Sequence, residues 1–430
     1  MTKEELYRSK VVSIDEALSK IKSGDFISCG AYGDEPLELL SNIHKIADRV
    51  ENVRIWTHLT QRPYEYAFND AYKGRIDMES LFYGPVGRLK HKEKRITYIP
   101  TDLHNTGKVF AARHTNVFIA AVTPPDRHGF VRMACSQQCE EEAMEAADLV
   151  IFEVNPQLPL INGTNQIPIE KVDYFVEVDY PTPAIDGIPI TSVERAIAAN
   201  VAELIDDGAC IQLGIGGMPN AVGEALVDKK DLGIHTEMIT SVMGMLMEKG
   251  VVTNERKTLH RGKTIGAFAF GSQQLYDYLD GNPMVELMHA RYVNDPFVIA
   301  QNDNMVSINT ALQIDLTGQV CSESIGAKQF SGPGGASDFA YGAYRSKGGK
   351  SIIALASTAK KGTVSKIRPI LDPGSAVTIR RSIVDYIVTE YGVAHLKFKS
   401  VKERVDELIN ICHPDFRADL RKEAEDLMIW

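Results

Sequence analysis

Glu237 is the residue whose surroundings point most clearly to chemistry. It lies in the apolar run LGIHTEMI, downstream of the glycine-rich stretch LGIGGMPNAV (Leu213 to Val222). Charged side chains are depleted in apolar strands, so a buried one needs a reason. Closely spaced glycines let backbone N–H groups approach a ligand. A carboxylate that can attack and a loop that can hold an oxyanion together indicate acyl chemistry.

Both signals also have structural explanations. The loop Gly214-Ile215-Gly216-Gly217 lacks the Lys of a Walker loop and the third glycine of a dinucleotide fingerprint, so it also suits a tight strand-to-helix turn without a ligand. Glu237 also suits a solvent-facing position on an edge strand. His235 projects to the same face of a strand, and we interpret it as a hydrogen-bond partner rather than a catalytic base.

Three further segments combine turns with polar side chains. FSGPGGASDF (Phe330 to Phe339) contains Asp338 and suits an oxyanion or nucleotide site, or a plain loop before a helix. STAKKGTVSKIRP (Ser357 to Pro369) has four cations, which suit phosphates or a solvated surface. TPPDRHGF contains Asp126 and His128, but its paired prolines favour a structural turn.

Composition restricts the class of protein. A chain of 430 residues with 24% charged and 44% hydrophobic residues predicts a globular protein of two or three domains. The net charge of −10 disfavours a nucleic-acid binder. The N-terminus lacks a signal segment and no apolar run is long enough to span a membrane, which predicts a cytoplasmic protein without a membrane partner. The six cysteines form no CxxC pair, so we expect free buried thiols and no metal site.

The chain repeats a pattern of helix, glycine, strand and glycine turn. Residues 13–36 and 191–219 each begin with a capping-box signature, continue with helix-spaced apolar residues and stop at Gly24 or Gly208. The repeat predicts two related open α/β domains. The Pro/Gly-rich stretch at residues 180–190 marks the boundary. We therefore expect an N-terminal domain over residues 1–185 and a C-terminal domain over residues 186–430.

Short apolar runs in both halves predict strands of a parallel sheet, because such strands are buried on both faces. The expected strands include residues 116–122, 147–154, 351–357 and 385–392. Ligand sites in open α/β sheets lie beyond the carboxyl ends of the strands, and both glycine turns are expected there. The C-terminal tail predicts two helices interrupted near His413-Pro414.

Taken together, the motifs resemble the acetyl-CoA hydrolase/transferase family, and within it the 4-hydroxybutyrate and butyrate coenzyme A-transferases. The resemblance covers nearly the whole chain and is carried by IKSGD, PPDRHGF, FEVNPQLP, QLGIGGMPNAV, LGIHTEM, INTALQIDLTGQV, IGAKQFSGPGGASDF, VTEYGVAHL and HPDFR. One segment departs from the family pattern: Ser241-Val242-Met243 replaces an Asp-Gly-type continuation. We therefore expect Met243 and Met245 to line a more apolar acyl pocket.

The resemblance implies an active site in the cleft between two α/β domains, with Glu237 as the nucleophile. It implies that coenzyme A is a substrate rather than a resident cofactor, and that the enzyme is a homodimer or a dimer of dimers. The residues implied to bind coenzyme A or to stabilise oxyanions are Gly214, Ile215, Gly216, Gly217, Met218, Leu312, Gly334, Gly335, Lys360 and Gly362.

The implied activity is transfer of coenzyme A between an acyl-CoA, acetyl-CoA by family expectation, and a short-chain carboxylate such as 4-hydroxybutyrate or butyrate. It proceeds by a ping-pong reaction through a glutamyl-CoA thioester. The nearest alternative is an acyl-CoA hydrolase that uses the same glutamate, with Asp338 as a candidate to orient water. A more distant alternative is a sugar-phosphate isomerase-like or ligand-sensing protein on a similar scaffold.

Overall fold

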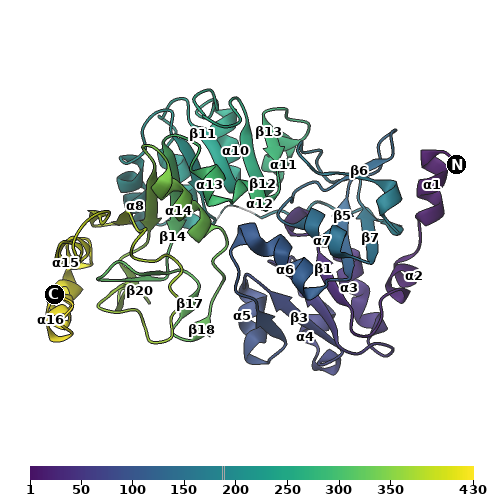
Figure 1. Cartoon of the computed structure of the whole chain (residues 1–430), viewed down its shortest axis with the longest axis horizontal. Helices are drawn as coiled ribbons and strands as arrows, with labels where there is room; N and C mark the ends of the chain where they lie inside the picture. The colour runs from purple at the N-terminus through teal and green to yellow at the C-terminus, as the bar shows by residue number, and fades with distance from the viewer. Residues whose placement is uncertain (186, 188) are drawn as a thin grey trace. The chain divides into compact units, whose positions relative to one another are not determined.

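The computed structural model describes residues 1–185, 187 and 189–430 (Figure 1). The chain forms two compact units, Met1–Asp186 with Ala267–Tyr292, and Gly187–Gly266 with Val293–Trp430. The domain break expected after residue 185 falls beside Asp186 and Ile188, which lie outside the described residues. The expectation that all of residues 186–430 forms the second domain is corrected, because Ala267–Tyr292 belongs to the first unit.

Packing explains why the segment Ala267–Tyr292 joins the first unit. Tyr276 is buried in one hydrophobic cluster with Ala121 and Cys135. The backbone of Gln137 donates to the carbonyl of Ala267 at 2.8 Å and accepts from the N–H of Ala290 at 3.1 Å. These contacts connect residues far apart in the chain, and local sequence patterns carry no information about them.

The first unit is built on a seven-stranded sheet with the order β4-β3-β2-β1-β5-β7-β9. Every neighbouring pair is parallel. The strands are β1 (Phe26–Cys29), β2 (Val53–Trp56), β3 (Ile76–Ser80), β4 (Ile96–Tyr98), β5 (Val117–Val122), β7 (Leu149–Val154) and β9 (Tyr174–Glu177). All six residues of β5 are buried, as expected for a strand that is covered on both faces.

Short helices and one ribbon complete the first unit. The ribbon pairs β6 (Phe130–Arg132) with β8 (Gln166–Pro168) in antiparallel register. The helices are α1 (Lys3–Lys10), α2 (Ile14–Ser19), α3 (Leu37–Asn42), α4 (Glu65–Phe68), α5 (Pro85–Lys92), α6 (Thr106–Arg113), α7 (Glu140–Ala146) and α11 (Gln273–Leu279), with 3-10 turns η1 (Tyr32–Asp34), η2 (Ile43–Ile46), η3 (Asp70–Tyr72), η4 (Leu103–Asn105) and η5 (Ile169–Lys171). Strand β13 (Val285–Leu287) also belongs to this unit.

The second unit has a largely parallel sheet, in which six consecutive strands have the order β11-β10-β14-β19-β23-β24. They are β11 (Gly233–Ile239), β10 (Cys210–Leu213), β14 (Met305–Thr310), β19 (Lys350–Ala354), β23 (Tyr386–Thr389) and β24 (Gly392–His395). The pairs from β11 to β23 are parallel, and β23 pairs with β24 in antiparallel register. Strand β12 (Thr264–Ala269) and helix α12 (Ala290–Val293) each contain residues of both units.

Helices and small ribbons surround this sheet. The helices are α8 (Ser192–Ala202), α9 (Gly217–Ala225), α10 (Ser241–Glu248), α13 (Pro296–Ile299), α14 (Ala336–Arg345), α15 (Val401–Asn410) and α16 (Arg417–Asp426), with the 3-10 turn η6 (Pro414–Phe416). The short strands are β15 (Gln313–Asp315), β16 (Val320–Cys321), β17 (Ser324–Ile325), β18 (Lys328–Gln329), β20 (Thr358–Ala359), β21 (Val364–Ser365) and β22 (Ile367–Arg368). The interruption predicted near His413-Pro414 is confirmed by the break between α15 and α16.

The sequence repeat has the same place in both sheets. Helix α2 and Gly24 precede β1, which pairs with β2 and β5. Helix α8 and Gly208 precede β10, which pairs with β11 and β14. Gly24 and Gly208 have φ of 82° and 78°, in the region that favours glycine. The prediction of two related α/β halves is confirmed, and each glycine turn follows a strand at which the strand order reverses.

The described residues include no helix that is both long and apolar enough to cross a bilayer. All six cysteines are free and buried, which confirms the predicted thiol state.

Arg95 fixes one end of the first sheet from inside the core. Its side chain is fully buried and donates to the carbonyls of Tyr66 at 2.6 Å, Asn69 at 3.0 Å and Ile76 at 3.0 Å. Its Nε also donates to the carboxylate of Asp77 at 3.2 Å. One guanidinium therefore satisfies acceptors from α4, the turn that follows it, and β3.

Replacing Arg95 with Met is expected to lower the free energy of unfolding by about 3–5 kcal/mol, because the change removes four hydrogen bonds that a buried guanidinium donates, among them those to the carbonyls of Tyr66 and Ile76. Urea denaturation measures the loss. Lys92→Met, at an exposed position of α5, is the matched control and should have little effect. Equal midpoints for the two variants would contradict the role given to Arg95.

Candidate active site

Glu237 is the fifth residue of β11 and the only one of its seven residues that is not fully buried. A strand this apolar needs a specific environment to hold a carboxyl group. The residue keeps some exposed surface. Glu237 therefore lies in a largely desolvated setting without being fully buried.

Two groups donate hydrogen bonds to this carboxylate. Nδ2 of Asn294 donates to Oε2 of Glu237 at 2.9 Å, and the backbone N–H of Gly335 also interacts with the carboxylate. Asn294 is fully buried and directly follows α12. Gly335 is the N-cap residue of α14. Two neutral donors from separate elements therefore hold the carboxylate of Glu237.

Glycine is required at position 335 by the closeness of this contact. A Cβ atom at Gly335 would lie 1.9 Å from Oε2 of Glu237 and 2.3 Å from Nδ2 of Asn294. The preceding Gly334 has φ of 51°, where glycine is favoured. The structure thus places the turn at Gly334-Gly335 directly against the carboxylate that the sequence singled out.

The surroundings raise the pKa of Glu237 to about 7. Burial is the largest cause, and the negative charge of Asp338 adds to it, whereas the donors Asn294 and Gly335 lower the pKa. Asp338 is itself buried in the first turn of α14. The ionised form of Glu237 is therefore less stabilised than an ordinary carboxylate in water, which favours its reaction with an electrophile.

The side chain of His235 contacts the backbone rather than the carboxylate of Glu237. Its ring is fully buried, and Nε2 lies 2.8 Å from the carbonyl oxygen of Val293. Burial, helped by the charge of Lys257, lowers the pKa of His235 to about 3. A neutral imidazole on a backbone carbonyl positions the segment just before Asn294, and thereby the amide that binds Glu237.

The glycine loop at residues 214–218 leaves the carboxyl end of β10. This strand is parallel to β11, which carries Glu237, with Ile211 opposite Ile234. Gly214 donates its N–H to the carbonyl of Ile308 at 3.2 Å, and Gly216 has φ of 111°. A Cβ at Gly217 would lie 2.5 Å from Oε1 of Glu194, so a larger residue at the start of α9 would displace that side chain.

The remaining predicted residues follow the next strands of the same sheet. Leu312 lies two residues after β14, and its N–H donates to the carbonyl of Cys321 at 2.9 Å. The exposed Lys360 and Gly362 form the turn between β20 and β21, shortly after β19. The strands β11, β10, β14 and β19 are consecutive neighbours. Their carboxyl ends therefore carry or lead to all the predicted residues outside the Gly334-Gly335 turn.

Two side chains near Glu237 differ from what the sequence indicated. Asn294 was not predicted, since nothing in the run VNDPF marks it as functional. Met243 was expected to line an acyl pocket, but it is fully buried because α10 packs this face into the core. Met245 is half-buried and keeps the exposed surface that such a role needs.

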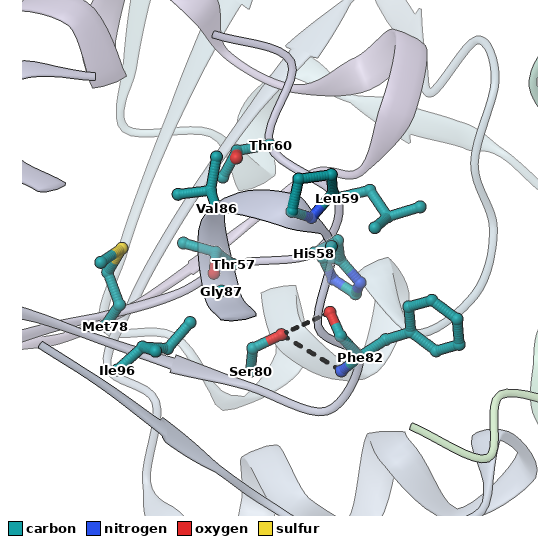
Figure 2. A pocket seen from close by; sticks show the side chains of 12 residues that line it. Thr57, His58, Leu59, Thr60, Met78, Ser80, Phe82, Val86, Gly87 and Ile96 are labelled. Atoms are coloured by element: carbon teal, nitrogen blue, oxygen red, sulfur yellow. Dashed lines mark hydrogen bonds between the residues drawn. The ribbon is translucent and has the colours of Figure 1, made fainter. Parts of the chain in front are cut away.

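The first unit has a small cavity at the carboxyl ends of β2 and β3 (Figure 2), with a volume of about 50 Å³. Its walls include the apolar side chains of Met78 and Ile96 and the ring of His58. Burial lowers the pKa of His58 to about 4, so the ring is neutral at pH 7. This cavity is too small for a nucleotide and contains none of the predicted site residues.

Two family models match the chain. The N-terminal domain of acetyl-CoA hydrolase/transferase matches residues 1–186, and the C-terminal domain of the same family matches residues 271–424. The 4-hydroxybutyrate coenzyme A transferase of Clostridium kluyveri is 43% identical, with 98% of each chain covered. The succinyl-CoA:cyclohexane-1-carboxylate CoA transferase of Geobacter metallireducens is 41% identical, over 98% of this chain and 96% of that protein. The crystal structure of RipA from Yersinia pestis superposes with a TM-score of 0.94 at 37% identity and covers 100% of both chains.

The pKa of Glu237 has a consequence for stability. Because the folded-state pKa of about 7 lies above the ordinary value of 4.5, the folded protein binds more protons than the unfolded chain between these pH values. The free energy of unfolding therefore falls as the pH rises through this window. Glu237→Gln has no group that ionises at this position, so its stability does not fall in this window. Relative to the wild type, the variant should therefore gain about 1–3 kcal/mol more in its free energy of unfolding at pH 8 than at pH 5.

Urea denaturation at the two pH values measures this difference. Glu248→Gln, at an exposed position of α10, is the matched control. The environment described for Glu237 would be refuted by equal effects of Glu237→Gln at both pH values.

Proposed function

The chain belongs to the acetyl-CoA hydrolase/transferase family, and on this basis we propose that it transfers coenzyme A from an acyl-CoA to a carboxylic acid with Glu237 as the nucleophile. The observation that carries the proposal is the pair of neutral donors on the carboxylate of Glu237, from Asn294 and Gly335. They orient the carboxylate and are already in place for the charge that develops.

The proposed reaction conserves every group. A carboxylate oxygen of Glu237 attacks the thioester carbon, and the C–S bond breaks to give an acyl-glutamyl anhydride and the thiolate of coenzyme A. The thiolate then attacks the glutamyl carbonyl, which forms a glutamyl-CoA thioester and releases the first acid as its carboxylate. The second acid attacks this thioester, and the same steps run in reverse. No proton has to be moved, so a carboxylate suffices as nucleophile and leaving group.

Asn294 and Gly335 have a specific part in this scheme. When the thiolate attacks the glutamyl carbonyl, negative charge develops on the oxygen that was Oε2, which the amide of Asn294 contacts at 2.9 Å. One preorganised donor of this kind is worth about 3 kcal/mol in the transition state. The donors therefore stabilise the oxyanion on the enzyme side of each step.

The second oxyanion forms on the substrate carbonyl, and we assign its donors to the part of the loop that follows Gly214, from Ile215 to Met218. Glycine at 216 is favoured by its backbone conformation, and Gly216 and Gly217 leave main-chain N–H groups unshielded by side chains. Leu312, Lys360 and Gly362 are assigned to the coenzyme A site, because they follow the adjacent strands. Binding energy from the nucleotide can then be used at the reacting carbon.

The identity of the carboxylic acid that accepts coenzyme A is a separate question from the type of reaction. The two most similar relatives described above are named for 4-hydroxybutyrate and for cyclohexane-1-carboxylate, so related chains of this length act on different acids. We propose acetyl-CoA with 4-hydroxybutyrate or butyrate, and a cytoplasmic homodimer or dimer of dimers. The partly exposed Met245 gives the acyl region an apolar surface suited to a short alkyl chain.

Glu237→Gln is expected to lower the transfer rate at least 10⁴-fold, because an amide neither attacks a thioester nor leaves as a carboxylate. The assay follows loss of acetyl-CoA with and without added butyrate or 4-hydroxybutyrate. Acetyl-CoA consumption at the same rate without an acceptor acid would identify a hydrolase instead. Borohydride reduction after incubation with acetyl-CoA should label Glu237, and a label on another residue would refute the assignment.

Gly335→Ala is expected to lower kcat about 10²–10³-fold, because the added Cβ displaces the carboxylate from its donors. The Cβ would lie 1.9 Å from Oε2. Gly187→Ala, where no heavy atom lies within 4 Å of the added Cβ, is the matched control and should keep the wild-type kcat. An unchanged kcat in Gly335→Ala would show that this turn does not hold the reacting carboxylate.

A further inference from the structure

A partly open polar cavity of about 70 Å³ lies within the first unit. Its walls are formed by Met133 and Gln137, by helix α7 and by residues 164–168, which include β8. The buried polar residues in its lining are Gln137, Glu140 and Asn165. Thr164, Gln166 and Lys171 are exposed and form its rim. The mechanism proposed for Glu237 uses none of these groups.

Two carbonyl oxygens in this lining lack a donor. Nδ2 of Asn165 donates to the carbonyls of Met133 at 2.5 Å and Ile161 at 3.0 Å, which fixes the amide and leaves Oδ1 on the other side. Among the described residues, neither Oδ1 of Asn165 nor Oε1 of Gln137 has a hydrogen-bond partner. The two side chains are only 1% and 2% exposed. Buried oxygen atoms without a partner are uncommon and costly.

The same wall carries uncompensated negative charge. Glu140 is 3% exposed and accepts hydrogen bonds from the hydroxyl of Ser136 and from the N–H of Cys139. Asp34 does not line the cavity; it is fully buried behind this wall, accepts from the backbone N–H groups of residues 134–136 and repels Glu140. In the described part of the chain, neither carboxylate has a cation within ion-pair distance. A buried charge of this kind calls for a counter-charge or for a proton.

Other charged groups at the cavity do not supply that counter-charge. Glu141 is neutralised by Arg291 at 2.7 Å, and it also contacts His289 at 3.0 Å, although burial lowers the pKa of that ring. Lys171 and Glu145 lie on the exposed rim, where water screens their charges. The interior therefore offers oxygen acceptors with a net negative charge.

We propose that this cavity binds a monovalent metal cation, with Oε1 of Gln137, Oδ1 of Asn165 and the carboxylate of Glu140 as its protein ligands. Alkali cations are hard ions that prefer oxygen, and carbonyl oxygens are their usual protein ligands. One carboxylate with two neutral carbonyls matches a single positive charge. Among the described residues, no group of three or more His, Cys, Asp or Glu could hold a metal ion, which disfavours a divalent or transition metal.

The size of the cavity agrees with this ligand. One water molecule needs about 10–15 Å³ of cavity volume on this measure, so about 70 Å³ has room for an ion together with several completing waters. The bound ion would connect the turn at Gln137, helix α7 at Glu140 and the end of the ribbon at Asn165. Its expected effect is therefore greater stability of the first unit, and the inference does not depend on the proposed transfer reaction.

The first experiment compares thermal unfolding of the full chain in KCl, NaCl and tetramethylammonium chloride at one ionic strength. Binding to the folded state alone should raise the Tm by roughly 2–4 °C in K⁺ or Na⁺ relative to tetramethylammonium, which is too large for the cavity. The salt that gives the larger shift identifies the preferred ion. Equal Tm values in all three salts would overturn the proposal.

Variants separate ion binding from a structural role. Gln137→Met removes one ligand at similar volume and should abolish the cation-dependent shift, whereas Gln274→Met, at an exposed position of α11, should keep it. Glu140→Gln keeps the hydrogen-bonding shape but removes the charge, so it should raise the Tm in tetramethylammonium and lose the response to K⁺ and Na⁺. A cation-dependent shift that persists in both cavity variants would overturn the assignment of ligands.

A direct measurement does not depend on these variants. Crystals grown with rubidium or thallium(I) in place of K⁺ should show an anomalous peak between Gln137, Glu140 and Asn165. Density for water alone, with no anomalous signal, would refute the cation site and would leave the two amide oxygens paired with water.

Discussion

The structure around the active site depends on one constraint, namely that a carboxylate must be held in a mostly desolvated strand where no cation of the described residues forms an ion pair with it. Glu237 meets this constraint through neutral donors, the amide of Asn294 and the backbone of Gly335. The burial of Asn294, the glycine at 335 and the fixed position of His235 on the carbonyl of Val293 all serve the placement of these donors. Each would be hard to explain if Glu237 were an ordinary surface residue.

The sheet supplies the rest of the geometry. Parallel strands with a reversal in their order bring the ends of β11, β10, β14 and β19 together at one edge. Segments separated by more than a hundred residues, such as Gly214 and Lys360, thereby follow neighbouring strands. The same arrangement of β2, β1 and β5 in the first unit explains the repeated sequence pattern, since each repeat builds the central strand of its own sheet.

Features encoded by local periodicity and turn chemistry could be predicted from the sequence. These include the strands at β5, β7, β19 and β23, the two tail helices and the glycines at positive φ. Glu237 and the Gly334-Gly335 turn were identified as candidates, but their direct contact could not be derived from spacing, because it joins β11 to the start of α14 across the fold. Asn294 escaped prediction for the same reason: its function lies in one long-range hydrogen bond. The grouping of Ala267–Tyr292 with the first unit likewise depends on the packing of Tyr276.

The choice of Asn rather than Arg or Lys beside Glu237 follows from the chemistry. A guanidinium would hold both oxygens of the carboxylate, lower its pKa by one to three units and stabilise the ground state that has to react. An amide donates one hydrogen bond to one oxygen, and so it orients the group while leaving its charge largely uncompensated. The nearby Asp338 works in the same direction by raising the pKa of Glu237. The site thus keeps its carboxylate reactive at a cost in stability. The neutral donors limit that cost, and their hydrogen bonds become stronger when negative charge moves onto Oε2 during the reaction.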